Sequence, residues 1–166
     1  MNEIARITGL MQAVFEGDPY YGPSVLGVLN GVTAKQAASR RRWMAHSIWE
    51  IVAHLTAELR YATSVIDGSA GPWVEGVTTW PRIDDRSPEA WTRALEDLRR
   101  ANRKLVEVVE QLEEEILVRE PGIVRGPYYL VLHGTLQHNV FHAGELSMLT
   151  GGLGVRKPGT ASGTQV

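Results

Sequence analysis

Four stretches of the chain carry apolar residues at every third or fourth position, the spacing that places them on one face of an α-helix. These stretches predict helices at residues 3–16, 46–67, 87–114 and 127–150. Helical periodicity dominates the sequence, so we expect an all-α protein. Four helices of this length are typical of a four-helix bundle.

Residues with known preferences for helix ends mark several of these boundaries. Ser47 and Glu50 have the spacing of a capping box at the start of the second helix. Ser87 and Pro88 place a capping serine and a first-turn proline at the start of the third. The glycines at 151–152 end the fourth helix.

The segments between the helices are long, which permits helices to follow one another by crossing the bundle. Residues 71–86 contain two prolines and two tryptophans, and connections of this length are often functional. In the second connection, 115–126, we expect a short extended piece at 116–118. Residues 23–31 predict a short helix, and Thr33 caps a further helical turn.

Length and charge narrow the class of protein further. The chain has 166 residues, which suits one domain; we expect the bundle to occupy 1–152 and an irregular tail to occupy 153–166. A formal charge of −2 lacks the basic excess of a nucleic-acid-binding protein. No signal-peptide pattern or membrane-length apolar stretch is present, so we expect a cytoplasmic protein without membrane contact. The absence of cysteine excludes thiolate ligands and disulfides.

Two of the five histidines, His138 and His142, are four residues apart in the last predicted helix. At that spacing they point about 40° apart around the helix axis, so both imidazoles can reach one metal ion. Asn139 stands where helical zinc proteases have glutamate, which argues against that activity. We expect the helix to be largely interior because apolar residues surround the pair: Leu132, Leu136, Val140, Phe141, Leu146 and Leu149. Buried imidazoles need partners, and a metal ion would satisfy both.

A third ligand must come from another helix, and His54 lies within the apolar stripe of the second one. A single core histidine is commonly a hydrogen-bonded structural residue. Together with His138 and His142, however, it completes a set of three imidazoles. Three histidines that leave coordination positions open are typical of catalytic zinc sites.

Two acidic residues are candidates for catalysis beside this set. Glu58 is four residues after His54, and Glu145 is three residues after His142, so each points in a similar direction to its histidine. Each glutamate can transfer protons, accept a hydrogen bond from an imidazole N–H, or simply be exposed. The sequence leaves these three roles open.

The remaining histidines are not expected to be ligands. His133 precedes His138 by five residues, which turns it about 140° away around the helix axis. We therefore interpret it as a supporting, packing or surface residue. His46 lies at the start of the second helix and is expected to be a surface or capping residue.

Two segments, 46–54 and 132–146, resemble the signature regions of the DinB/YfiT-like family. Residues 17–22, with the sequence Gly-Asp-Pro-Tyr-Tyr-Gly, are also similar to that family, so the resemblance covers most of the chain. It implies a four-helix bundle in an up-up-down-down arrangement that is often dimeric. Glu145 is a departure, because many relatives have glutamine at this position.

The resemblance also implies a cofactor and a chemistry. It implies a divalent metal ion, typically zinc or nickel with iron as a further candidate, bound by His54, His138 and His142. Some members of the family are transferases that use a low-molecular-weight thiol such as bacillithiol or mycothiol. The leading hypothesis is therefore a homodimeric metal-dependent enzyme that acts on small molecules, through a thiol of this kind.

Two other functions stay open from the sequence. The chain can be a non-catalytic metal-binding or ligand-binding module, or a structural helical protein whose core histidines are satisfied by hydrogen bonds. Several aromatic residues are candidates for a pocket lining, although core packing or surface exposure is the simpler interpretation of each. These residues are Tyr20, Tyr21, Trp49, Trp73 and Trp80.

Overall fold

The computed structural model describes residues 2–40, 42, 44–71 and 79–154, and these residues form helices and no strands. The elements are α1 (Glu3–Phe15), α2 (Val25–Leu29), α3 (Ala34–Ala37), α4 (Ile48–Ile66), α5 (Pro88–Glu110), the 3-10 helix η1 (Glu114–Val118) and α6 (Tyr128–Gly152). The all-α prediction is confirmed. The extended piece expected at 116–118 is wrong, since these residues belong to η1. Trp73 and tail residues 155–166 lie outside the described residues.

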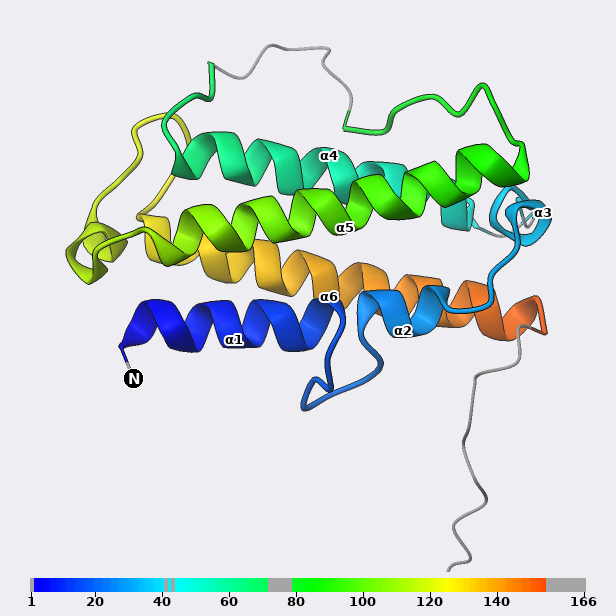
Figure 1. Cartoon of the computed structure of the whole chain (residues 1–166), viewed down its shortest axis with the longest axis horizontal. Helices are drawn as coiled ribbons and strands as arrows, with labels where there is room; N and C mark the ends of the chain where they lie inside the picture. The colour runs from blue at the N-terminus through cyan, green and yellow to red at the C-terminus, as the bar shows by residue number, and fades with distance from the viewer. Residues whose placement is uncertain (1, 41, 43, 72–78, 155–166) are drawn as a thin grey trace, which may run out of the picture.

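The four long helices α1, α4, α5 and α6 lie side by side around a common apolar core (Figure 1). α4 packs against α5 and α6, and α1 packs against the same two helices. In Figure 1, α1 and α6 run in one direction and α4 and α5 in the other. Their order along the chain is therefore up, down, down, up, which differs from the up-up-down-down order expected.

The parallel course of α4 and α5 determines the path of the chain between them. The C-terminal end of α4 and the N-terminal end of α5 lie at opposite ends of the molecule (Figure 1). Their connection must therefore return along the helices, as a crossover does. Its described residues at 79 and 80 meet the middle of α4, where His54 lies.

Side-chain caps begin the two central helices as predicted. The Ser47 hydroxyl accepts from the Glu50 amide at 3.2 Å, and the Glu50 carboxylate accepts from the Ser47 amide at 2.7 Å. This capping box fixes the first turn of α4 and thereby the register that carries His54. At α5, Ser87 caps the helix and Pro88 is its first residue.

α6 is less interior than its sequence suggested. Leu132, Leu146 and Leu149 are buried, but Val140 is 41% exposed and Phe141 is 62% exposed. The expectation of burial was therefore wrong for these two residues, because α6 carries apolar side chains on its outer surface as well as toward the core. Among the described helices, none combines the length and hydropathy that crossing a membrane requires.

Candidate metal centre

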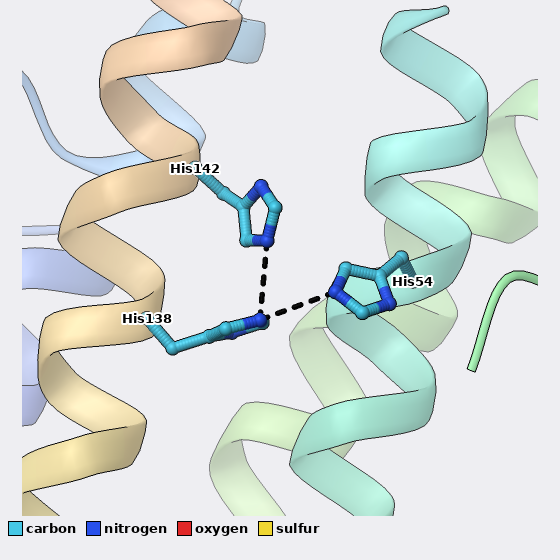
Figure 2. Close-up of side chains that lie close together, drawn as sticks. All are labelled: His54, His138 and His142. Atoms are coloured by element: carbon cyan, nitrogen blue, oxygen red, sulfur yellow. Dashed lines mark hydrogen bonds between the residues drawn. The ribbon is translucent and has the colours of Figure 1, made fainter. Parts of the chain in front are cut away.

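Three histidine side chains from two helices meet in the interior. His138 and His142 extend from consecutive turns of α6, and His54 extends toward them from α4 (Figure 2). The Nε2 atom of His138 is 3.1 Å from Nε2 of His54 and 3.1 Å from Nε2 of His142. His54 and His142 are buried, and His138 is partly buried. The structure thus brings together all three predicted ligands.

These separations fit one metal ion bound by all three rings. Two imidazole nitrogens bonded to zinc at about 2.0–2.1 Å are roughly 2.8–3.4 Å apart for angles of about 90–109° at the metal. The two measured distances of 3.1 Å fall within this range. No other group of three or more potential ligands in the described residues meets the same spacing.

Hydrogen bonds on the far side of two rings orient their lone pairs toward the common point. Nδ1 of His54 donates to the main-chain carbonyl of Thr79 at 2.8 Å, because a carbonyl oxygen can only accept. Nδ1 of His142 donates to the Glu145 carboxylate at 2.6 Å. In each neutral ring the lone pair is then on Nε2, the atom that faces His138.

The three Nε2 atoms are better satisfied by one metal cation than by one shared proton. A single N–H on Nε2 of His138 cannot be directed at both neighbouring lone pairs with good geometry. A divalent ion accepts electron pairs from all three nitrogens at once. The contacts to the Thr79 carbonyl and Glu145 are also the supporting hydrogen bonds that histidine ligands usually make.

Burial favours the neutral, metal-binding form of the two α6 histidines. It lowers the pKa of His138 to about 4, and the neighbouring His142 and His54 add to this effect. Burial also lowers the pKa of His142, and this outweighs the opposing attraction of the Glu145 carboxylate. Both rings are therefore unprotonated at neutral pH, as metal ligands must be.

Trp80 covers the site from the connection between α4 and α5. Its indole is parallel to the ring of His54, with centroids 4.0 Å apart, and to the ring of His46, with centroids 3.5 Å apart. Two parallel rings this close to one centroid must lie on opposite faces of the indole. Trp80 is thus sandwiched between the two imidazoles, and the partly exposed His46 has a stacking contact that the sequence did not predict.

The other aromatic candidates lie elsewhere in the described chain. Tyr20 and Tyr21 are 94% and 80% exposed, so neither lines an enclosed pocket. Trp49 is buried in the core beside Trp91, with ring centroids 5.1 Å apart. Of the aromatic residues named as candidates and described, Trp80 alone reaches the histidines.

A cavity of about 320 Å³ between α4 and α6 reaches one of the three histidines, His138. His138, Glu58 and Asn139 contribute to its wall, and Arg125 adds a cation from the chain before α6. Most of the remaining lining is apolar: Leu59, Ala62, Val65, Leu130 and Val131. A small molecule in this cavity would therefore lie beside His138, with a carboxylate within the same space.

The two glutamates predicted as catalytic differ in position. Glu145 accepts the hydrogen bond from His142, which is one of the three roles that the sequence left open. Glu58 shares the cavity with His138, and its charge acts to raise the pKa of His142 against the larger effect of burial. Direct participation of either glutamate in a reaction stays a prediction.

His133 lies apart from the three ligands, as its helical direction predicted. Its ring packs on Tyr129 with centroids 4.2 Å apart, and its Nε2 atom is buried without a hydrogen bond. The sequence did not identify the Thr79 carbonyl as a partner of His54. A main-chain acceptor in a loop leaves no signal in residue type or spacing.

Compared with protein-family models, curated proteins and solved structures, the chain shows no significant match to any of them. The resemblance to the DinB/YfiT-like family therefore stays a prediction. The case for a function depends on the geometry of the three histidines and of the cavity beside them.

Proposed function

We propose that this protein binds one divalent metal ion through His54, His138 and His142, and that it is a metal-dependent enzyme. The observation that carries the proposal is the convergence of three Nε2 atoms with two separations of 3.1 Å, with the rings of His54 and His142 each held by a hydrogen bond at Nδ1. Zinc and nickel suit three imidazoles, and iron is a further candidate.

Three protein ligands leave coordination positions open, which favours catalysis over a purely structural site. A divalent ion at this position supplies a Lewis acid that lowers the pKa of a small molecule bound to it. Around it, Glu145 and the Thr79 carbonyl orient two ligands, and Trp80 shields His54 from solvent. Glu58 is placed to donate or accept a proton in the cavity next to His138.

The cavity supports a small-molecule substrate with an apolar part. Its mainly apolar wall would bind that part, while Glu58 and Arg125 would orient polar groups. We further propose that the helices form a DinB/YfiT-like four-helix bundle and that the substrate pair includes a low-molecular-weight thiol. Both statements derive from the resemblance of residues 46–54 and 132–146 to that family.

Metal titration of the His54→Ala variant tests the ligand set. Metal-free wild-type protein, prepared with a chelator, should bind one equivalent of Zn²⁺ or Ni²⁺. Losing one of three ligands should weaken that affinity by more than about 100-fold. His133→Ala is the matched control, since it also replaces a partly buried histidine of this molecule but leaves the trio intact. Unchanged affinity in His54→Ala would refute the assigned ligands.

A second experiment separates an enzyme from a binding module. Fully metallated protein is assayed with glutathione, bacillithiol and mycothiol, each combined with a panel of chloroarenes and epoxides. Turnover that disappears in His54→Ala supports a thiol transferase. Metal binding without turnover for any pair would instead favour the non-catalytic module, and failure to bind metal at all would favour a structural role for the histidines.

A further inference from the structure

A separate cavity lies at the end of the molecule where α3 and the start of α4 are found (Figure 1). Its volume is about 420 Å³, within the usual range of ~300–1,000 Å³ for small-molecule sites. It is lined by residues from two segments, 38–50 and 80–86, and shares none of them with the cavity beside His138. We call it the arginine cavity, because its lining includes Arg40, Arg82 and Arg86.

The lining of the arginine cavity is positively charged. It contains three arginines and one acidic residue, Glu50, although the chain as a whole has a formal charge of −2. A guanidinium group keeps its charge in proteins. Positive charge is therefore concentrated in this cavity against the balance of the whole chain, and a cleft of one sign attracts ligands of the opposite sign.

Glu50 offsets at most one of the three arginines, and its carboxylate is already engaged. It accepts a hydrogen bond from the Ser47 amide at 2.7 Å, as part of the capping box of α4. It also lies 3.9 Å from Nη1 of Arg40. Arg40 is held in place from its other side, because its Nη2 group donates to the Ala45 carbonyl.

The two other guanidinium groups are available to a ligand. The side chain of Arg86 has neither an ion pair nor a hydrogen bond with any residue in the described part of the chain. Arg82 is 2.7 Å from Asp84, but the two side chains are 89% and 76% exposed, and ion pairs this exposed contribute little. An anion can therefore pair with Arg86 and compete for Arg82. Planar guanidinium groups bind phosphate and carboxylate oxygens through two parallel hydrogen bonds.

An aromatic stack separates the arginine cavity from the three histidines of the candidate metal centre. His46 and Trp80 line the cavity, and the Trp80 indole lies between the rings of His46 and His54. His54, His138 and His142 are not part of the lining. A ligand in the arginine cavity would thus contact the far side of the stack, where an N–H of the His46 imidazole offers one more donor.

We propose that the arginine cavity binds a small molecule that carries a phosphate or carboxylate group. Arg82 and Arg86 pair with the anionic group from the connection before α5, Arg40 adds a third cation, and His46 adds a donor. The volume suits a small molecule rather than a polymer, and the net negative charge of the chain disfavours nucleic acid. This inference is independent of the proposed metal and enzymatic activity.

Isothermal titration calorimetry of the full chain tests the proposal. The protein is first treated with a chelator and dialysed, so that no bound metal can hold an anion. Inorganic phosphate and citrate are the two probes and distinguish the two classes of anionic group, and glycerol is the uncharged control. We expect saturable binding of one equivalent of at least one probe, with a dissociation constant below about 10 mM. The absence of saturable binding for both probes would overturn the proposal.

Replacing one arginine tests which residues bind the probe. Arg86→Gln should weaken binding at least about tenfold, because charge-assisted hydrogen bonds to the anion are lost. Arg103→Gln is the matched control: it removes the same charge from an exposed arginine of α5 outside the cavity, and it should bind as the wild type does. Unchanged affinity in Arg86→Gln, or an equal loss in Arg103→Gln, would refute the assigned site.

Nuclear magnetic resonance locates the bound probe without any substitution. The indole N–H resonance of Trp80 and the ring resonances of His46 should shift during the titration, because both side chains line the cavity. The indole N–H of the buried Trp91 is the internal control, since it donates to the Val32 carbonyl at 2.8 Å and lies outside the cavity. Saturable binding that leaves the Trp80 and His46 resonances in place would put the anion elsewhere and contradict the proposal.

Discussion

The hydrogen bond between Glu145 and His142 provides a sensitive test of the proposed metal centre, because it can be weakened without replacing any of the three histidines. Glu145→Gln keeps an oxygen that can accept from Nδ1 and removes the negative charge. Glu145→Ala removes the acceptor as well. If the carboxylate orients the ring and increases its basicity, both changes should lower metal affinity. The loss should be larger for Glu145→Ala than for Glu145→Gln.

The magnitude follows from the position of the carboxylate. Supporting hydrogen bonds to histidine ligands contribute about 10–100-fold to metal affinity, or about 1.4–2.7 kcal/mol. The 2.6 Å contact to a buried ring is short, but the Glu145 side chain is 35% exposed, so solvent screens part of its charge. We therefore expect a loss of about tenfold for Glu145→Gln and a loss toward 100-fold for Glu145→Ala.

The assay is competition for Zn²⁺ against a chelating dye at neutral pH, with circular dichroism to confirm that each variant is folded. Glu110→Ala serves as the matched control, because Glu110 is an exposed glutamate of α5 away from the three histidines. Wild-type affinity in Glu145→Ala would show that this hydrogen bond does not support the site. An equal loss in Glu110→Ala would show that the effect is general electrostatics.

Three further predictions concern stability. In metal-free protein the His138 pKa of about 4 lies below its ordinary value near 6.5. Between these two pH values the unfolded state therefore binds more protons than the folded state. The free energy of unfolding, measured with urea, should fall as pH is lowered from 6.5 toward 4. Zinc at 100 times its dissociation constant should stabilise the protein by about 2.7 kcal/mol, visible as a higher melting temperature that His54→Ala lacks. Trp91→Phe should cost about 1–3 kcal/mol in urea denaturation at pH 7, because the Val32 carbonyl loses its 2.8 Å indole donor; no change would contradict this.

The sequence predicted which three histidines come together because the signals for their positions are local and additive. The spacing of His138 and His142 places them on consecutive helical turns whatever the rest of the fold, and the capping box at Ser47 and Glu50 fixes the start of the helix that carries His54. Apolar periodicity then implied that both helices border one core. The three rings meet as these signals together indicated.

What the sequence did not predict depends on long-range packing. The partners of His54 at residues 79 and 80 follow it by 25 or more positions, in a connection whose path no periodicity describes. Val140 and Phe141 read as core residues because α6 is apolar on every side, and composition alone cannot say which side faces inward. Residues 116–118, where a short extended piece was expected, belong to a 3-10 helix instead.

The crossover between α4 and α5 links the topology of the protein to its chemistry. A parallel pair of helices requires a return segment, and in many folds such a segment serves only to span a distance. Here that segment also carries the acceptor that orients one imidazole and the indole that shields it. Insertions or deletions within it would shift both groups relative to α4, so its length is constrained by the contacts with His54 as well as by the separation of the helix ends.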